Sequence, residues 1–450
     1  MRLKQFSVQG LFGLFEHKIP FNLNERITII HAPNGYGKTV MLRLIEAFFG
    51  NSFKIFREME FKTIIFEFDD GRSVRIVKKN RPPQSGQPPR PSILVFSLIK
   101  SGKIIENWDT DIDKKSDGRP GASPTYYLDR YVPYLTRVGV REYRDVRSGE
   151  QLSLFEAVER YSDHLPVEAR KGLSIPDWLS VIRRSVHCQL IETQRLMKLA
   201  RTDDTRWPDP ATAFIPAVKT DSEGLVSRMR QTLADNANLS SSLDRTFPTR
   251  ALSRLGETKN APSEDTLRAK LYSLERQRAR LSEVGLLDKA DGTPLVPREH
   301  MEMAARKFLS EYVLDTEKKL STYDDILKRI ELLIEIVNSR FQFKSLSISR
   351  AKGFVFTDVL GKKVELESLS SGEQHELVLV YGLLFNTKEG TLLLIDEPEI
   401  SLHVAWQRQF LSDLRRIIEL SPLDALLSTH SPQLIGGHLN LAVKLEGPKF

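Results

Sequence analysis

Residues 29–39 read Ile-Ile-His-Ala-Pro-Asn-Gly-Tyr-Gly-Lys-Thr, and this short segment restricts the fold of the whole chain. The β-branched run Ile27–Ile30 predicts a strand, and apolar residues at helical spacing in Val40–Phe49 predict a helix. Between them, Gly35 and Gly37 let the backbone adopt positive φ and approach a ligand closely. Because backbone N–H groups at a helix N-terminus attract anions, the segment predicts a phosphate-binding loop.

The same segment matches the P-loop pattern of nucleotide-binding proteins, except that Ala32 stands where the first glycine is usual. In this pattern the lysine, here Lys38, places its charge on the β- and γ-phosphates, and the hydroxyl of the next residue, here Thr39, binds Mg²⁺. We therefore predict ATP and Mg²⁺ as the cofactors. The predicted nucleotide-binding residues of the loop are Asn34, Gly35, Tyr36, Gly37, Lys38 and Thr39.

A second chemical feature is the apolar run Leu392–Ile395, which ends in Asp396 and Glu397. In sheets of parallel strands, residues that follow a buried strand lie at the carboxyl edge, where ligands bind. We predict that Asp396 holds Mg²⁺ through its water shell and that Glu397 polarises the attacking water as a general base. The alternative is a strand end with a solvated acidic turn.

Upstream of the acidic strand, Leu369–Gln374 reads Leu-Ser-Ser-Gly-Glu-Gln, and Gly372 lies 24 residues before Asp396. With the P-loop and the acidic strand, this segment resembles the ABC ATPases, and specifically their signature motif at a helix N-terminus. In that class the signature of one head caps the nucleotide on the P-loop of another. The resemblance therefore implies a head-to-head dimer or higher homo-oligomer. It implies nucleotide contacts by Ser370, Ser371, Gly372 and Glu373.

The motifs that follow keep the order of this class. Ser401–His403 resembles the D-loop, and Ser428–Pro432 follows the strand-like Ala425–Leu427 and resembles the switch-histidine segment. The resemblance implies that His430 hydrogen-bonds the γ-phosphate and takes part in catalysis. Considered alone, a histidine is more often structural, so this interpretation depends on the order of the motifs.

The segment His187–Leu196 resembles the strand-plus-glutamine segment, or Q-loop, of the RecF, SMC and OLD relatives. The resemblance implies that Gln194 contacts both Mg²⁺ and the attacking water, which makes it a catalytic and a metal-binding residue. Gln189 is the alternative position, and the simpler interpretation is that both are ordinary polar residues.

The pattern of strand-like and helical segments predicts an α/β fold, and the resemblance implies an ABC-type ATPase head split by a helical insertion. Paired strands are expected at Thr63–Phe68 and Val74–Val77, and apolar stripes at helical spacing between residues 221 and 340 flank a turn at Asp288–Pro297. A short coiled coil and an ordinary helical bundle both fit these stripes. The predicted domains are 1–200 (first head lobe, with P-loop and Q-loop), 201–340 (helical hairpin or coiled-coil insertion) and 341–450 (second head lobe).

Charge and composition limit the partners and the cellular compartment that we expect for the protein. The formal net charge of +7 permits a nucleic-acid partner without requiring one. The single cysteine, Cys188, cannot form an internal disulfide, and no apolar run is long enough to span a bilayer. We therefore expect a cytoplasmic protein with no membrane partner.

For the biological role, the chain resembles stand-alone ATPase subunits of OLD-like bacterial phage-defence systems, such as PARIS and Septu. OLD-type nucleases carry a nuclease domain after the head, whereas about twenty residues follow His430 here. The resemblance implies a sensor and scaffold that answers to DNA or a phage protein as trigger and controls an effector nuclease encoded nearby.

Two alternatives stay open. One is a DNA-repair or DNA-clamping ATPase of the RecF or SMC kind, in which arginines contact phosphates. Interleaved Glu142 and Asp145 make an ordinary solvated face the competing interpretation. The other is a pseudo-ATPase that binds nucleotide only to assemble, against which the presence of Glu397 argues. The candidate phosphate contacts are Arg137, Arg141, Arg144, Arg147, Arg183 and Arg184.

Overall fold

The computed structural model describes residues 1–50, 53–80, 92–110, 124–139, 142–146, 149, 151–161, 164–165, 175–192, 196–199, 214–256, 261–288, 296–297, 300–400 and 402–448. The chain divides into two compact units. Unit 1 comprises Met1–Thr193 and Thr387–Phe450, and unit 2 comprises Gln194–Asn386. The predicted α/β class is confirmed, because unit 1 contains a parallel sheet with helices before and after its strands.

A five-stranded sheet forms the centre of unit 1, and all of its neighbouring strands pair in parallel. Parallel pairing places the carboxyl ends of the strands at one edge, which is where polar side chains can meet a ligand. The order of the strands is β11 (Cys188–Ile191), β17 (Leu392–Asp396), β18 (Asp424–Thr429), β3 (Ile27–His31) and β19 (Ala442–Lys444). The helices that follow β3, β17 and β18 are α1 (Lys38–Phe49), α12 (Val404–Leu420) and α13 (Pro432–Ile435).

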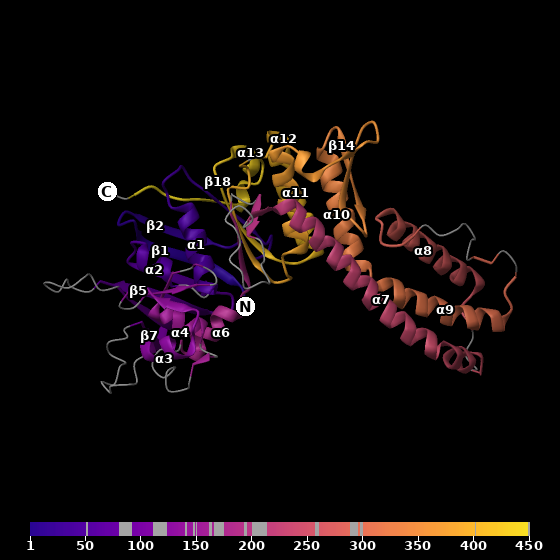
Figure 1. Cartoon of the computed structure of the whole chain (residues 1–450), viewed down its shortest axis with the longest axis horizontal. Coiled ribbons are helices and arrows are strands. Elements are labelled where there is room, and N and C mark those ends of the chain that lie inside the picture. Colours follow the sequence, from indigo (N-terminus) through magenta and orange to yellow (C-terminus); the bar gives the residue numbers. More distant parts are fainter. Residues whose placement is uncertain are drawn as a thin grey trace. The chain divides into compact units, whose positions relative to one another are not determined.

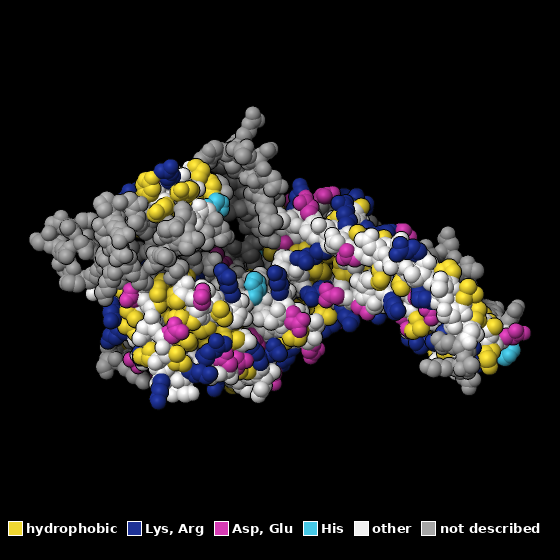
Figure 2. Space-filling model, turned by 90° about the horizontal axis from the view of Figure 1, so that it is seen from below, with side chains coloured by type: hydrophobic (Ala, Val, Ile, Leu, Met, Phe, Trp, Pro, Cys, Tyr) yellow, Lys and Arg dark blue, Asp and Glu magenta, His cyan; other side chains and the backbone are white. Residues whose placement is uncertain are grey.

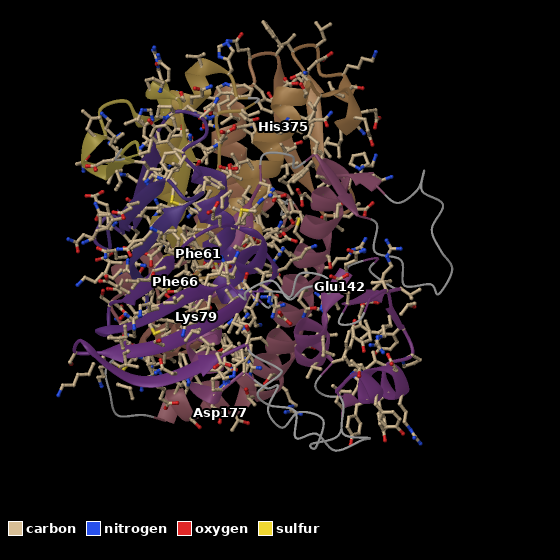
Figure 3. All side chains as sticks on the ribbon, turned by 90° about the vertical axis from the view of Figure 1, so that its left-hand side faces the viewer. Phe61, Phe66, Lys79, Glu142, Asp177 and His375 are labelled. Atoms are coloured by element: carbon tan, nitrogen blue, oxygen red, sulfur yellow. The ribbon has the colours of Figure 1, made fainter. Side chains whose placement is uncertain are left out.

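A second, antiparallel sheet of six strands shares one apolar core with α1. The rings of Phe48 on α1 and Phe66 on β4 stack with centroids 4.0 Å apart, and Figure 3 shows Phe61 and Phe66 within this region. The predicted pairing of residues 63–68 with residues 74–77 is confirmed. The strand order is β2 (Phe15–Pro20), β1 (Leu3–Leu11), β4 (Thr63–Phe68), β5 (Arg72–Lys79), β6 (Ile93–Lys100) and β7 (Lys103–Asp109). Also in unit 1 are α2 (Lys54–Glu58) and α6 (Asp177–Ser185).

A small satellite core in unit 1 joins a three-stranded sheet to two short helices. Leu128, Tyr143 and Leu152 are buried in it. The hydroxyl of Tyr161 donates to the carboxylate of Asp145 inside this core. Its elements are α3 (Pro124–Tyr131), β8 (Leu135–Arg137), β9 (Glu142–Asp145), β10 (Gln151–Ser153) and α4 (Leu154–Arg160).

Unit 2 is mostly helical, and α9 lies beside both α7 and α8 (Figure 1). Arg250 of α7 pairs with Glu311 and Asp315 of α9, which joins the two long helices through charged side chains. The predicted apolar stripe on α8 is buried at Leu267, Leu271, Leu274 and Leu281. The helices are α7 (Ala217–Gly256), α8 (Glu264–Glu283), α9 (Met303–Ser321), α10 (Asp324–Arg340) and α11 (Ser371–Phe385). The short elements are β12 (Met197–Leu199), β13 (Phe214–Pro216), β14 (Lys344–Ser349), β15 (Gly353–Asp358), β16 (Lys363–Val364) and the 3₁₀ turn Leu366–Ser368.

The described helices contain no segment that is both long enough and apolar enough to cross a membrane.

Candidate nucleotide-binding site

The glycine-rich loop connects β3 to α1 in unit 1. Gly35 and Gly37 have φ values of 87° and 80°, which side chains with a Cβ rarely adopt. A Cβ on Gly37 would lie 2.7 Å from Leu11 Cδ2, so a larger residue here would force the Leu11 side chain to shift. Gly37 is the N-cap residue of α1, and the loop therefore presents the N-terminal N–H groups of a 12-residue helix.

Lys38 is the first residue of α1, and its residue surface is only 5% exposed. Its Nζ donates hydrogen bonds to the carbonyl oxygens of Ala32 (2.7 Å) and Pro33 (3.1 Å) within the loop. Burial lowers the pKa of Lys38, while the charges of Glu397 and two other carboxylates act in the opposite direction. The ammonium group thus lies inside the loop where the P-loop pattern places a phosphate contact.

Thr39 and Asp396 meet although they lie 357 residues apart. The Thr39 hydroxyl donates to Asp396 Oδ2 at 2.8 Å, and Asp396 is 6% exposed. The other carboxylate oxygen, Oδ1, is buried without a hydrogen-bond partner among the described residues. One hydroxyl and one carboxylate fit Mg²⁺, which keeps waters and takes phosphate oxygens for its remaining positions. The described residues contain no group of three or more His, Cys, Asp or Glu side chains that could hold a metal ion.

Glu397 and His430 form the third contact of the site. His430 Nε2 lies 2.5 Å from Glu397 Oε1, and His430 Nδ1 lies 3.2 Å from Lys38 Nζ. Because an ammonium group only donates, Nδ1 accepts from Lys38, and Nε2 carries the hydrogen that is donated to Glu397. Glu397 has a positive φ of 44°, a strained conformation for a residue with a Cβ, and its N–H donates to the carbonyl oxygen of Ser428.

Two residues that the sequence patterns did not single out also shape this site. His17 Nε2 on β2 donates to the carbonyl oxygen of Tyr36 in the loop at 3.0 Å, and burial lowers the pKa of His17. Glu399 Oε1 accepts hydrogen bonds from Thr429 and from the backbone of His430. The acid two positions after Glu397 was a visible signal for Glu399, whereas no local pattern pointed to His17.

The predicted Q-loop residue Gln194 and the D-loop residue Ser401 lie outside the described residues. Gln189 is half-buried on β11, and the parallel register pairs it with Leu393, three residues before Asp396. Its backbone therefore lies away from the carboxyl edge of the sheet. His403, also from the D-loop segment, is the N-cap of α12 and accepts from the N–H of Ala405 through Nδ1.

The signature segment lies in unit 2, at the N-terminus of α11. Ser370 is the N-cap: its hydroxyl accepts from the N–H of Glu373, and Glu373 Oε2 accepts from the N–H of Ser370. Lys344 on β14 donates to both oxygens of Glu373, at 2.9 and 2.7 Å. Burial alone would raise the pKa of Glu373, but hydrogen bonds from Lys344 and Ser370 outweigh burial and lower it. Ser371 is exposed and Gly372 half-buried, so the capped helix end is accessible.

The candidate DNA-contacting arginines differ in how exposed their side chains are. Arg183 is 3% exposed and donates to the carbonyl oxygens of Phe48 and Gly50 at the end of α1, so its assignment as a phosphate contact was wrong. On the face that Figure 2 shows, Lys and Arg side chains of the described residues are interspersed with Asp and Glu side chains. Arg137, Arg144 and Arg184 are exposed, and Arg141 and Arg147 lie outside the described residues.

Comparison with protein families gives one match. Residues 231–436 match a family described as "AAA domain, putative AbiEii toxin, Type IV TA system". The matched residues include the signature segment, the acidic strand and His430, and they end before the chain returns to the sheet at β19. No curated protein matches the chain.

Comparison with solved structures finds SMC heads. The Smc head domain with an extended coiled coil bound to the C-terminal domain of ScpA, from Pyrococcus furiosus, is 11% identical with a TM-score of 0.33, covering 96% of this chain and 90% of that one. The SMC head domain from Thermotoga maritima is 11% identical with a TM-score of 0.32, covering 100% of both chains. At these TM-scores the whole chains do not superpose. The family match, by contrast, makes residues 231–436 similar to an AAA-type ATPase domain.

Proposed function

We propose that this protein binds ATP with Mg²⁺ and hydrolyses it to ADP and phosphate. The observation that carries the proposal is a set of hydrogen-bonded side chains at the carboxyl edge of the parallel sheet. One pair joins Thr39 to Asp396, and a separate chain of contacts runs from Lys38 through His430 to Glu397. These five side chains come from α1, β17 and the segments that follow β17 and β18, so the fold brings together the groups that phosphate transfer requires.

Each group has a definite role in the reaction. The oxygen of water forms a bond to the γ-phosphorus, the bond from that phosphorus to the β–γ bridging oxygen breaks, and ADP leaves. Glu397 accepts a proton of the attacking water, and His430 holds the Glu397 carboxylate in place through Nε2. Lys38 compensates negative charge on the phosphates, and Thr39 with Asp396 would hold Mg²⁺, which neutralises phosphate charge when bound.

The signature segment supports a dimeric arrangement. Ser370 and Ser371 are exposed at the N-terminus of the 15-residue helix α11, where N–H groups and the helix dipole favour an anion. We infer that this helix end caps the nucleotide held by the P-loop of a second copy. One chain carries one loop and one signature, so a pair with twofold symmetry would complete two identical sites. ATP would then join the two heads and hydrolysis would release them.

For the biological role we propose an antiphage function. The description of the family matched by residues 231–436 includes the words "putative AbiEii toxin, Type IV TA system", and this link to a toxin–antitoxin system is the observation that supports the proposal. In this proposal the chain is a cytoplasmic sensor and scaffold. Its nucleotide state would control a separate effector nuclease in answer to DNA or a phage protein.

The alternative is an ATPase that clamps or repairs DNA. The net charge of +7 and the exposed Arg137, Arg144 and Arg184 favour it. Each arginine that contacts a phosphate adds roughly one unit to the slope of log affinity against log salt concentration. DNA binding that is absent, or that does not vary with salt, would exclude this alternative.

The first experiment measures ATP turnover by the purified chain, with and without duplex DNA, and uses Glu397→Gln as the comparison. We expect Glu397→Gln to keep ATP binding, to slow turnover by about 10²–10⁴-fold and to accumulate the ATP-bound dimer. Turnover by the variant at the parental rate would show that Glu397 is not the base. Stimulation of ATP turnover by DNA would favour the DNA-clamping function. If DNA does not change the turnover, the next experiment is a search for a nuclease that co-purifies with the chain.

A further inference from the structure

The turn after the acidic strand contains a third carboxylate, Glu399, which the roles described above do not use. Pro398 separates it from Glu397, and the N–H of Ile400 donates to the carbonyl oxygen of Glu397 to close the turn. The turn directs the Glu399 side chain to the loop that follows β18, about 30 residues further along the chain.

Three donors converge on one oxygen of this carboxylate. Glu399 Oε1 accepts from the Thr429 hydroxyl at 2.7 Å, from the His430 N–H at 2.8 Å and from the Ser431 N–H at 3.2 Å. Two of the three are backbone groups, so the carboxylate fixes the main chain of the loop itself. Hydrogen bonds to an ionised acceptor are among the stronger ones in proteins. The position of the His430 backbone is therefore set by Glu399 as well as by strand β18.

A side chain of α12 reinforces the same loop. Gln407 Oε1 accepts from the Ser431 hydroxyl at 2.7 Å, and Gln407 Nε2 donates to the carbonyl oxygen of Leu402 at 3.0 Å. Gln407 thus connects the loop after β18 to the segment after β17. The loop that carries His430 is therefore held both by Gln407 of α12 and by Glu399 in the turn after β17.

The consequence appears at the imidazole ring. Both ring nitrogens of His430 are engaged, one by Glu397 at 2.5 Å and one by Lys38 at 3.2 Å. A shift of the His430 backbone would change both contacts together. Burial lowers the pKa of Lys38, and the charges of Glu397, Asp396 and, least of the three, Glu399 act in the opposite direction.

We propose that Glu399 is a positioning residue: by accepting three hydrogen bonds at Oε1, it aligns His430 between Lys38 and Glu397. Glu399 acts through His430 and does not touch the reacting atoms. This inference rests on the proposed ATP hydrolysis for its kinetic consequences, but the alignment itself is a property of the folded chain.

The kinetic test compares Glu399→Ala with Glu399→Gln, and uses Glu419→Gln, an exposed glutamate of α12, as the control. Glutamine keeps an oxygen acceptor and removes the charge, whereas alanine removes the acceptor. A displacement of about 1 Å in a catalytic arrangement can cost 10²-fold in rate. We expect Glu399→Ala to lower kcat by about 10–100-fold with KM for ATP within about threefold. Glu399→Gln should stay within about fivefold of the parent, and Glu419→Gln should equal it.

Combining Glu399→Ala with His430→Ala tests whether the effect passes through the histidine. If it does, the double variant is no slower than His430→Ala alone, because the two residues act as a unit. An additional loss of rate in the double variant would overturn the proposal. Equal losses in Glu399→Gln and Glu399→Ala would overturn it too, since charge rather than the acceptor would then matter.

Nuclear magnetic resonance tests the alignment of His430 without a measurement of ATP hydrolysis. The sequence contains nine histidines, so the ring ¹⁵N signals of a histidine-labelled protein can be resolved, and His430→Gln assigns the signal of interest. We expect Glu399→Ala to shift the His430 ring signals while Glu419→Gln leaves them unchanged. Unmoved signals in a folded Glu399→Ala protein would overturn the proposal. Absence of ATP hydrolysis by the parent would overturn the proposed function alone.

Discussion

Replacing Arg183 by lysine separates a structural role from DNA binding. Arg183 Nε donates to the Phe48 carbonyl oxygen at 2.7 Å, a second guanidinium nitrogen donates to the Gly50 carbonyl oxygen, and the guanidinium carbon lies 4.6 Å from the centre of the Phe53 ring. These carbonyl groups belong to the end of α1, where a helix leaves its last acceptors unsatisfied. A lysine keeps the positive charge but lacks the planar guanidinium fork that serves both carbonyl groups and lies on the Phe53 ring.

The size of the effect depends on the contacts that lysine cannot replace. Leaving one charge-assisted hydrogen bond unmade costs about 1.5–3 kcal/mol, and losing the contact with the Phe53 ring costs about 0.5–2 kcal/mol. We therefore expect Arg183→Lys to reduce the free energy of unfolding of unit 1 by about 2–5 kcal/mol. For a unit of this size each kcal/mol lowers the melting temperature by about 2–4 °C, so a decrease of about 4–20 °C is expected.

The assay is thermal unfolding by calorimetry, with Arg184→Lys as the matched control. Arg184 is the next residue on α6 and is exposed, so its substitution should change stability by no more than about 0.5 kcal/mol. Both variants keep their charge, so any salt-dependent DNA binding should be equal in the two. Equal melting temperatures for the two variants, or DNA affinity lost only in Arg183→Lys, would refute the structural assignment.

Two further predictions concern the nucleotide loop. Gly37→Ala should weaken ATP binding and lower stability by about 2–4 kcal/mol, because a left-handed alanine is strained and its Cβ would displace Leu11, 2.7 Å away. Gly35→Ala, with no atom near the new Cβ, should cost only about 1–2 kcal/mol, so equal losses measured by calorimetry would contradict the packing argument. Thr39→Val removes the hydroxyl that contacts Asp396 at 2.8 Å and should abolish most of the gain in ATP affinity that Mg²⁺ gives. Titrating a fluorescent ATP analogue with Mg²⁺ or with EDTA measures that gain, and a parental response in Thr39→Val would exclude Thr39 as a metal contact.

The parts of the fold that the sequence predicts well are those encoded within one short segment. The segment from β3 to α1 has a β-branched strand, glycines that adopt positive φ, and helical spacing, so each local preference agrees with the final structure. The acids after β17 were predicted for a similar reason, because the residues directly after a buried parallel strand emerge at one edge of the sheet. That Asp396 contacts Thr39 is then a consequence of the position of both segments at that edge.

Contacts between distant segments explain what the sequence could not reveal. The basic end of α6 is typical of a solvated helix terminus, and Arg183 differs from Arg184 only in which side of the helix it occupies. Its partner carbonyl groups lie 133 and 135 residues earlier in the chain. Likewise, His17 acts on the loop through the backbone carbonyl of Tyr36, and a backbone acceptor leaves no trace in residue identity.

Glu399 shows why motif recognition alone gives an incomplete site. The acids at residues 396, 397 and 399 lie close together in the sequence, yet each has its own set of partners. Asp396 accepts from the Thr39 hydroxyl, Glu397 from the imidazole of His430, and Glu399 from the Thr429 hydroxyl and two backbone N–H groups. Asp396 and Glu399 each keep one buried oxygen without a partner among the described residues. Three hydrogen bonds on Oε1 hold the Glu399 carboxylate against the loop after β18, whereas the Glu397 carboxylate contacts the side chain of His430. The partners of each acid, and not its distance from the strand end, therefore distinguish the proposed base, Glu397, from the proposed positioning residue, Glu399.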